Sequence, residues 1–248
     1  MSKLSVLQTA PEPLLKVDDL HAWYGRSHIL QGVSLQAMPG EVVALIGRNG
    51  AGKTTTMKSI MGLLERIEGS IIFDGADLQQ LPAHKRFGHG LAFVFEERRI
   101  VAGLTVMENI ELGLMASAED RARTKEVIEE IAETFPRLKE RLFQEAVTMS
   151  GGEQQMLAIA RAMAARPKMI MLDEPSEGIM PKLVDEMFEY FDVLKKKGVT
   201  ILLVEQSVEH ALQIADRVYI MDQGEIVHHA PARDLLDDVS MQEKYCSV

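Results

Sequence analysis

Two glycine-rich segments of this sequence each precede a stretch with the pattern of a helix. The first reads GRNGAGKTT at residues 47–55, and the second reads TMSGGEQQM at residues 148–156. Glycines at a helix start leave backbone N–H groups free to point at an anion, and the positive end of the helix dipole adds to the attraction. The sequence therefore predicts two anion sites, about a hundred residues apart in one chain.

The first segment matches the phosphate-loop pattern, in which a glycine is followed after four residues by Gly-Lys-Thr. Lys53 can reach the β- and γ-phosphates of a nucleotide as a point charge, and the Thr54 hydroxyl can ligate Mg²⁺. A glycine-rich turn that precedes a lysine by chance is the alternative, but the apolar run VVALI before the loop and the helical pattern after it count against that interpretation. The candidate ATP-binding residues of this loop are Gly47, Arg48, Asn49, Gly50, Ala51, Gly52, Lys53, Thr54 and Thr55.

An acidic pair ends a second apolar run, MIMLDEP at residues 169–175. A strand there would carry Asp173 to its carboxyl end beside the phosphate loop, where the carboxylate can hold Mg²⁺ through water. Glu174 is placed to orient and deprotonate an attacking water. Taken alone, the segment is equally typical of a strand that ends in an acidic turn; its pairing with the phosphate loop favours nucleotide hydrolysis.

Strands that alternate with helices are expected to position these residues. Period-two alternation predicts antiparallel strands within 14–25 and 32–41, and continuous apolar runs predict buried strands at 42–47, 91–95, 169–173, 200–205 and 217–222. Helical patterns cover residues 54–64, most of 105–143, the stretch after residue 150, and 181–197. This order predicts an α/β fold with a mainly parallel core sheet, an antiparallel portion on its N-terminal side and an inserted helical subdomain at about 97–150.

Composition narrows the classes of protein. A net charge of −10 argues against a broad nucleic-acid or anionic-membrane surface. The single cysteine, Cys246, cannot form an internal disulfide, which is typical of a reducing compartment. No apolar run reaches the length of a membrane span, and the first residues lack the apolar core of a signal peptide. We expect a soluble, cytoplasmic domain at 14–236, with a frayed lead-in at 1–13 and a tail at 237–248.

The order of the motifs resembles the ATP-binding subunit of an ABC transporter, from about Leu14 to Leu236. SGGEQQ is similar to the signature motif of that family. The resemblance implies that two subunits meet head to tail, with each ATP between the phosphate loop of one subunit and the signature motif of the other. The residues that would bind the ATP of the partner are Ser150, Gly151, Gly152 and Glu153. The same segment also predicts a helix cap formed by its serine and glutamate, and the two roles are compatible.

The resemblance also implies roles for single residues. Tyr24 stands where the family has an aromatic ring that stacks on adenine, with a core tyrosine as the alternative. Gln206 stands where the family has its switch histidine; alternatively it only starts the next helix, and His210, one turn further on, contacts the γ-phosphate. The implied Mg²⁺ ligands are Thr54, Glu96 and Asp173, with a glutamate at 96 where the family usually has glutamine.

Glu96, the SEG segment at 176–178 and the VEQ segment at 204–206 are together similar to the ATPase subunits of branched-chain (hydrophobic) amino acid importers, and to close relatives that handle urea or short amides. Phe95, Val101 and Ala102 depart from the usual residues of a stretch near which the permease docks. The implied cofactors are ATP and Mg²⁺. The implied partners are a second ATPase subunit (a sister chain or a second copy), integral membrane permeases and, indirectly, an extracytoplasmic solute-binding protein, but no nucleic acid.

This resemblance implies a position on the inner face of the cell membrane. Two other functions are considered: a soluble ABC-type ATPase that acts on ribosomes or DNA, and a regulatory module that binds nucleotide without useful turnover. One unrepeated acidic domain counts against the first, and Glu174 beside Asp173 counts against the second.

Overall fold

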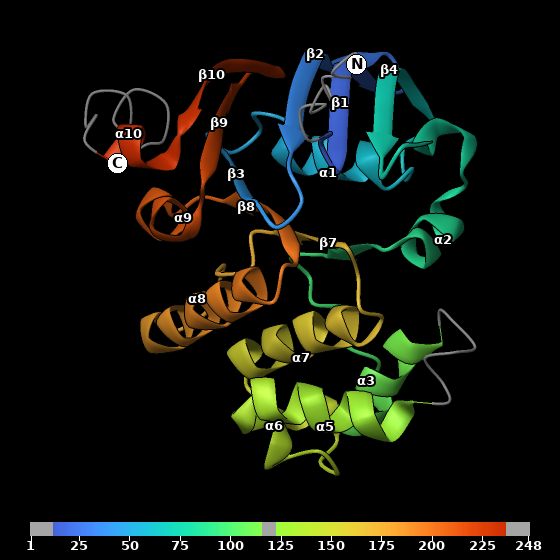
Figure 1. The fold of residues 1–248 in the computed structure, drawn as a ribbon, viewed down its shortest axis with the longest axis vertical. Helices are drawn as coiled ribbons and strands as arrows, with labels where there is room; N and C mark the ends of the chain where they lie inside the picture. Colours follow the sequence, from blue (N-terminus) through green and yellow to red (C-terminus); the bar gives the residue numbers. More distant parts are fainter. Residues whose placement is uncertain (1–11, 116–122, 237–248) are drawn as a thin grey trace, which may run out of the picture.

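The computed structural model describes residues 12–115 and 123–236. The tail expected at 237–248, with Cys246, and nearly all of the lead-in expected at 1–13 lie outside the described residues. Two sheets and a set of helices make up the fold (Figure 1).

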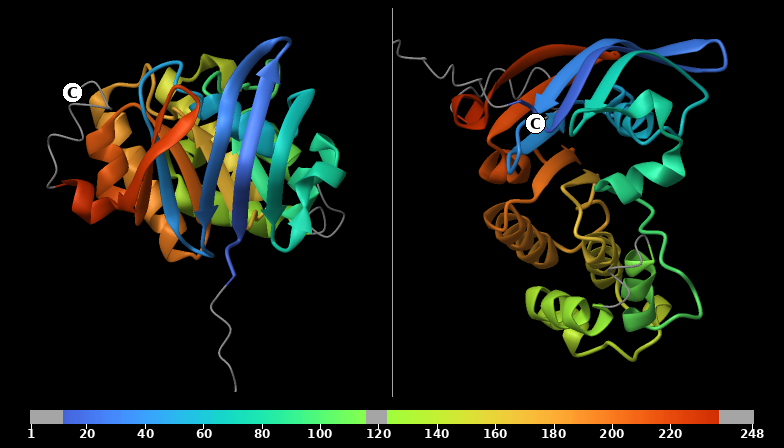
Figure 2. Two further views of the ribbon diagram at one scale, coloured as in Figure 1. Left: turned by 90° about the horizontal axis from the view of Figure 1, so that it is seen from above. Right: turned by 45° about the vertical axis from the view of Figure 1, so that its right-hand side comes forward.

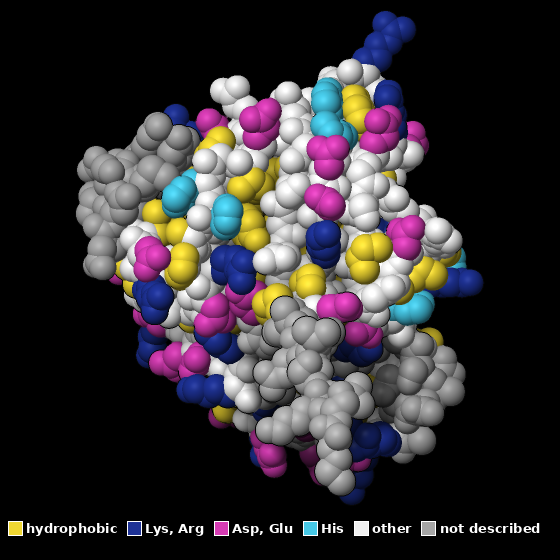
Figure 3. Space-filling view, turned by 45° about the horizontal axis from the view of Figure 1, so that its top comes forward, with side chains coloured by type: hydrophobic (Ala, Val, Ile, Leu, Met, Phe, Trp, Pro, Cys, Tyr) yellow, Lys and Arg dark blue, Asp and Glu magenta, His cyan; other side chains and the backbone are white. Residues whose placement is uncertain are grey.

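The N-terminal strands form a separate antiparallel sheet in the order β2-β1-β4-β5. Its strands are β1 (Leu15–Tyr24), β2 (Ser27–Ala37), β4 (Arg66–Phe73) and β5 (Ala76–Asp77). The alternation of β1 that predicted it places Leu15 and Val17 inside, while Lys16 and Asp18 are exposed. The outward face of this sheet carries charged and histidine side chains (Figure 3).

The second sheet has the order β10-β9-β3-β8-β7-β6, and its strands are parallel except for the edge strand β10. Its strands are β3 (Val42–Ile46), β6 (Leu91–Val94), β7 (Met169–Asp173), β8 (Thr200–Glu205), β9 (Arg217–Asp222) and β10 (Glu225–Pro231). The mainly parallel core sheet predicted from the apolar runs is confirmed.

Helices cover both faces of the parallel sheet. They are α1 (Lys53–Ile60), α2 (Ala83–Arg86), α3 (Val106–Leu114), α5 (Thr124–Thr134), α6 (Pro136–Lys139), α7 (Gly151–Ala164), α8 (Pro181–Lys196), α9 (Val208–Ile214) and α10 (Ala232–Leu236). Helix α1 lies between the two sheets, whereas α3, α5, α7 and α8 lie on the other face of the parallel sheet (Figures 1 and 2).

Strand β3 shows why its sequence is an unbroken apolar run. Val43 and Leu45 pack toward the antiparallel sheet and α1, and Val42, Ala44 and Ile46 pack toward the helices on the other face. All five side chains are fully buried. A strand inside a parallel sheet that is covered on both faces must be apolar at every position.

The helix predicted at 54–64 is shorter than expected. Helix α1 begins at Lys53 and ends at Ile60, and Gly62 follows in the left-handed conformation with φ 71°. A left-handed glycine just after the last turn is a common helix end. Leu63, which the pattern placed on the helix, is 46% exposed.

None of the described helices is both long enough and apolar enough to cross a membrane.

Candidate functional site

The carboxyl ends of three neighbouring strands bring the predicted chemistry to one edge of the parallel sheet. Strands β3, β8 and β7 are adjacent in that order. The phosphate loop follows β3, the acidic pair ends β7, and Gln206 follows β8. Residues about 30 to 150 positions apart in the sequence therefore meet at the edge where open α/β sheets bind ligands.

The phosphate loop wraps around the ammonium group of Lys53. Lys53 is 4% exposed, and its Nζ donates to the carbonyl oxygens of Gly47 at 2.8 Å and Arg48 at 3.2 Å. Gly47 has φ 153°, and a methyl group on it would lie 2.1 Å from the carbonyl oxygen of Met221. This close approach of two backbones admits only glycine at the first position of the loop.

Thr54 and Asp173 connect the phosphate loop to β7. The Thr54 hydroxyl donates to Oδ1 of Asp173 at 2.9 Å, and Asp173 is 2% exposed. Burial raises the pKa of Asp173 to about 6; the charges of Glu174 and Glu96 also raise it, and the hydrogen bond from Thr54 lowers it. Of the three predicted Mg²⁺ ligands, Thr54 and Asp173 are hydrogen-bonded to each other, and Glu96 acts on Asp173 through its charge.

This donor set fits a hard divalent cation that keeps most of its ligands from water and phosphate. It offers one hydroxyl, one buried carboxylate and the exposed carboxylate of Glu96. Within the described ranges no group of three or more histidine, cysteine, aspartate or glutamate residues could hold a metal ion. Nucleotide oxygens would therefore have to complete the coordination, as is usual for Mg²⁺.

The raised pKa of Asp173 predicts a pH-dependent effect on stability. In EDTA at pH 8 the buried carboxyl group of Asp173 is charged in the folded protein. Asparagine carries no charge there, so we expect Asp173→Asn to raise the free energy of unfolding by ~3 kcal/mol. Asparagine keeps the oxygen that accepts from Thr54. Because the pKa of Asp173 is raised in the folded state, the destabilisation of the wild type grows as the pH rises toward about 6 and is complete above it. The gap between variant and wild type should close as the pH falls from 6 toward 4.

Urea unfolding between pH 4 and 8 measures this gap. The exposed Asp18 provides the matched control, and Asp18→Asn should show no comparable pH dependence. A gap for Asp173→Asn that does not change with pH would contradict the prediction.

Glu174 lies between the phosphate loop and the end of β8. Its carboxylate is 3.5 Å from Lys53 Nζ and accepts a hydrogen bond from Nε2 of Gln206. Its backbone N–H donates to the carbonyl oxygen of Val204 at 2.9 Å, and its φ is 46°. A non-glycine residue in this left-handed region is held there by its surroundings, and such residues cluster at functional sites.

Gln206 and His210, the two candidates for the switch position, point to different partners. Gln206 contacts Glu174. His210 Nδ1 lies 2.6 Å from the Ser207 hydroxyl, and its Nε2 lies 3.5 Å from Asp185. The centroid of its ring lies 5.1 Å from that of Phe188 on α8, with the two rings tilted. This geometry favours Gln206 as the residue beside the acidic pair.

Glu205 is a further residue at this edge to which the sequence reasoning assigned no role. It is 1% exposed and accepts from the backbone N–H and hydroxyl of Ser176 at 3.0 and 2.8 Å and from the N–H of Gln206 at 3.2 Å. Burial raises its pKa, and these hydrogen bonds partly oppose the rise. Glu205 thereby ties the loop after β7 to the loop after β8. A charged residue at the end of an apolar strand was the available signal.

Tyr24 is 47% exposed at the end of β1. The alternative of a core tyrosine is therefore wrong, and the adenine-stacking role stays a prediction. Its neighbour Trp23 is half-buried. The Trp23 ring stacks on the His28 ring with their centroids 4.4 Å apart, and the Arg66 guanidinium lies over it, 4.1 Å from the ring centroid.

The second glycine-rich segment forms the predicted cap of α7. The backbone N–H and hydroxyl of Ser150 donate to Glu153 at 2.9 and 2.8 Å, and Arg141 lies 3.4 Å from the same carboxylate. Burial opposes ionisation of Glu153, but the hydrogen bonds from Ser150 and the charge of Arg141 outweigh it and lower the pKa.

The two glycine-rich segments do not meet within this chain. Helices α1 and α7 belong to different cores, on opposite faces of the parallel sheet. Within residues 12–115 and 123–236, no hydrogen bond or ion pair joins Ser150, Gly151 or Gly152 to the phosphate loop. The two segments that the sequence predicts to bind anions therefore lie apart in this chain.

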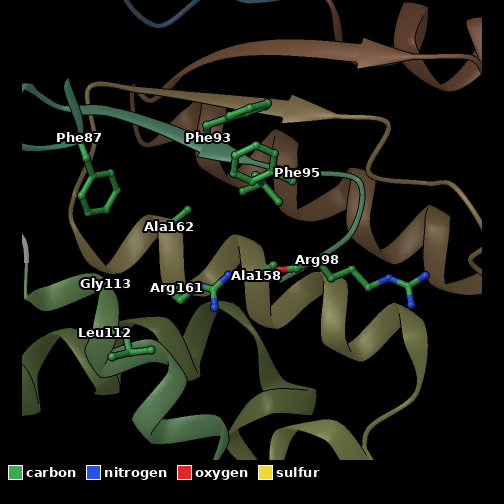
Figure 4. A pocket seen from close by; sticks show the side chains of 10 residues that line it. Phe87, Phe93, Phe95, Arg98, Leu112, Gly113, Ala158, Arg161 and Ala162 are labelled. Carbon is green, nitrogen blue, oxygen red and sulfur yellow. Dashed lines mark hydrogen bonds between the residues drawn. The ribbon is translucent and has the colours of Figure 1, made fainter. Parts of the chain in front are cut away.

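A groove lies between β6, α3 and α7 (Figure 4). The rings of Phe93 and Phe95 lie on one side of the groove and Arg161 lies on α7, whereas the Arg98 side chain runs away from the rings. The lining residues are Phe87, Phe93, Val94, Phe95, Arg98, Leu112, Gly113, Ala158, Arg161 and Ala162. The Phe95 ring, at a position where the family usually has another residue, has its centroid 4.2 Å from that of Phe93 and lies under the guanidinium of Arg99.

Known proteins resemble this chain in sequence and in fold. The family model for ABC transporters matches residues 30–177. The high-affinity branched-chain amino acid transport ATP-binding protein BraG of Pseudomonas aeruginosa is 41% identical, over 94% of this chain and 99% of that protein. The lipopolysaccharide export system ATP-binding protein LptB of Escherichia coli is 35% identical, over 90% and 92%. The crystal structure of a nucleotide-free ATP-binding cassette from an ABC transporter superposes with a TM-score of 0.83 at 27% identity, over 94% and 97%.

Proposed function

The chain belongs to the ABC transporter family as an ATP-hydrolysing subunit, and we propose that it powers the import of branched-chain or other hydrophobic amino acids. The observation that carries the catalytic part is the meeting of Lys53, Glu174 and Gln206 at one edge of the sheet. The similarity to BraG over nearly the full length of both chains supports the substrate class. The similarity to LptB makes lipopolysaccharide export an alternative, and urea or short amides are another.

In the proposed mechanism, the phosphates of ATP lie on the phosphate loop and replace Glu174 as the partner of the Lys53 ammonium group. Mg²⁺, held by Thr54, Asp173 and Glu96, would supply charge neutralisation at the β- and γ-phosphates. Glu174 then accepts the proton of the attacking water, and Gln206, already within hydrogen-bond reach of its carboxylate, orients that carboxylate and donates toward the phosphate.

A second ATPase subunit completes each site. Ser150, Gly151 and Gly152 offer a hydroxyl and backbone donors at the start of a long helix, which suits a γ-phosphate that arrives from outside the chain. Since these residues do not reach the phosphate loop of their own chain, we propose a head-to-tail dimer of two copies or of this chain with a sister chain. Tyr24, exposed at the end of β1, stacks on the adenine.

Membrane permeases are the proposed mechanical partners. The groove at Phe93, Phe95 and Arg161 is mostly apolar with a cationic edge, which suits a short amphipathic segment of a permease. The subunit would then work on the inner face of the cell membrane and meet an extracytoplasmic solute-binding protein only through the permeases.

Two experiments test this function. In the first, the tagged chain is captured from native membranes in mild detergent; in the second, leucine uptake is measured in cells. We expect two permeases to co-purify, and cells that carry the Glu174→Gln chain to lose energy-dependent leucine uptake. Co-purification with lipopolysaccharide-export components, or a normal leucine uptake with a lost urea uptake, would replace the amino-acid proposal by one of the alternatives. Co-purification with ribosomes would contradict a transport role.

The switch position gives a prediction of its own. We expect Gln206→Ala to lower ATP hydrolysis by about tenfold or more, because a donor beside the γ-phosphate is lost, with little change in ATP affinity. Gln206→His should stay active and gain an acid-side limb in its pH–rate profile, since imidazole titrates near a pKa of about 6.5. Steady-state hydrolysis from pH 5.5 to 9 measures both effects.

His210→Ala is the matched control, because His210 contacts Ser207 and Asp185 rather than Glu174. It should turn over at nearly the wild-type rate. Normal turnover in Gln206→Ala together with a crippled His210→Ala would assign the switch to His210.

A further inference from the structure

We propose that Arg98 is an additional ligand for the γ-phosphate of the partner's ATP, acting beside the signature motif. The proposal rests on the head-to-tail site proposed above. It adds a side chain that lies outside SGGEQQ in the sequence, in the loop after β6.

The guanidinium of Arg98 lies against the first residue of α7. A methyl group built on Gly151 would be 2.8 Å from Nη1 of Arg98 and 3.2 Å from Cζ and Nη2. Figure 4 shows the Arg98 side chain leaving the groove and running toward the N-terminal end of α7. A guanidinium beside Gly151 can also reach an anion bound by the backbone N–H groups at that helix start.

This guanidinium has no anionic partner among the residues that the structure describes. No hydrogen bond or ion pair of the Arg98 side chain is found across residues 12–115 and 123–236. The carboxylate of Glu153, at the same helix start, is taken by Ser150 and Arg141. An arginine that faces the positive end of a helix is unfavourably placed unless an anion lies between them. A phosphate would satisfy both groups, and the planar guanidinium can bind two of its oxygens at once.

Lys53 offers an internal comparison. Lys53 is likewise a cation at a helix start. Its ammonium group donates to the backbone carbonyl oxygens of Gly47 and Arg48, and the carboxylate of Glu174 compensates its charge. No described residue compensates the charge of Arg98 in this way, so that charge can be matched by an incoming ligand.

Two contacts hold the Arg98 backbone on α7. Arg161, a residue of α7, donates through Nη2 to the carbonyl oxygen of Arg98 at 3.2 Å and through Nη1 to that of Arg99 at 2.8 Å. Arg98 has φ 61° and Arg99 has φ 48°, so the chain turns sharply here and sends the two side chains to different places. Arg99 instead lies over the ring of Phe95 and pairs with Glu97. The loop therefore presents Arg98, rather than Arg99, beside Gly151.

ATP-dependent self-association of the full chain in a Glu174→Gln background tests the proposal. Sedimentation velocity with MgATP gives the dimer dissociation constant, and a fluorescent ATP analogue at low protein concentration gives nucleotide affinity of the monomer. We expect Arg98→Ala to raise the dimer dissociation constant about 10- to 100-fold, with monomer affinity unchanged. Arg98→Lys should be intermediate, because it keeps the charge but loses the two-pronged geometry.

Arg99→Ala is the matched control, since it removes the same side chain from the adjacent left-handed position of the same loop. It should leave the dimer dissociation constant unchanged. Equal dimerisation of Arg98→Ala and its Glu174→Gln parent would overturn the role of Arg98 while leaving the head-to-tail site intact. Equal losses in Arg98→Ala and Arg98→Lys together with a lowered unfolding temperature would show a structural role instead. Failure of the parent itself to dimerise with MgATP would contradict the pairing of two copies and, with it, this inference.

Discussion

Replacement of Glu174 by glutamine is expected to lower ATP hydrolysis by about 10²–10⁴-fold while ATP binding persists. Glutamine keeps the size of the side chain and can still hydrogen-bond with Gln206, but it cannot accept the proton of the attacking water. The carboxylate lies 3.5 Å from Lys53 Nζ, and its neutral replacement leaves the lysine charge to the phosphates. ATP affinity should therefore be equal or higher, and an ATP-bound dimer should accumulate.

Phosphate release and sedimentation velocity with MgATP check this expectation. Glu225→Gln, at an exposed glutamate of the edge strand β10, is the control and should hydrolyse ATP at the wild-type rate. Turnover near the wild-type rate in Glu174→Gln would show that another group takes the proton.

The second large effect is expected for Gly151→Asp, which should weaken ATP-dependent dimerisation by about 10²-fold or more. The new carboxylate would stand where the partner's γ-phosphate must lie, and like charges about 4 Å apart repel by several kcal/mol even when partly screened. It would also pair with the neighbouring Arg98 guanidinium and withdraw that cation from the phosphate. Binding of ATP to the monomer should not change, because α1 and α7 lie on opposite faces of the sheet.

Dimerisation of Gly151→Asp is measured in the Glu174→Gln background, and ATP binding to the monomer with a fluorescent analogue. Gly88→Asp is the matched control: it adds the same charge at a glycine without positive φ and with no atom near its substituent. A variant that loses ATP binding as a monomer would mean that the signature segment serves the nucleotide of its own chain.

The chemistry of short segments can be predicted from the amino-acid sequence. Glycine spacing and the Gly-Lys-Thr end specify the phosphate loop, because close backbone approach and a helix start depend on adjacent residues. Apolar runs of strand length specified a sheet buried on both faces, and Ser150 with Glu153, three positions further on, specified a helix cap. Each of these is a short-range pattern with a known period or spacing.

Contacts between residues that are distant in the sequence depend on the order of the strands in the sheet. The strand order β3-β8-β7 places Gln206 beside Glu174 and turns His210 toward α8, a choice that the sequence left open. The exposure of Tyr24 and the separation of the antiparallel strands into their own sheet were likewise undetermined by local pattern.

The position of Arg98 beside Gly151 is another contact that the sequence did not predict. Its sequence neighbours Glu97 and Arg99 are typical of an ordinary charged loop, and Ser150 lies 52 positions further along the chain. Only the packing of the loop on α7, through the two hydrogen bonds from Arg161, brings its guanidinium to Gly151. Side-chain chemistry and local periodicity depend on neighbouring residues. Contacts across a sheet, or between a loop and a helix, depend on how the elements pack, and packing is a property of the whole chain.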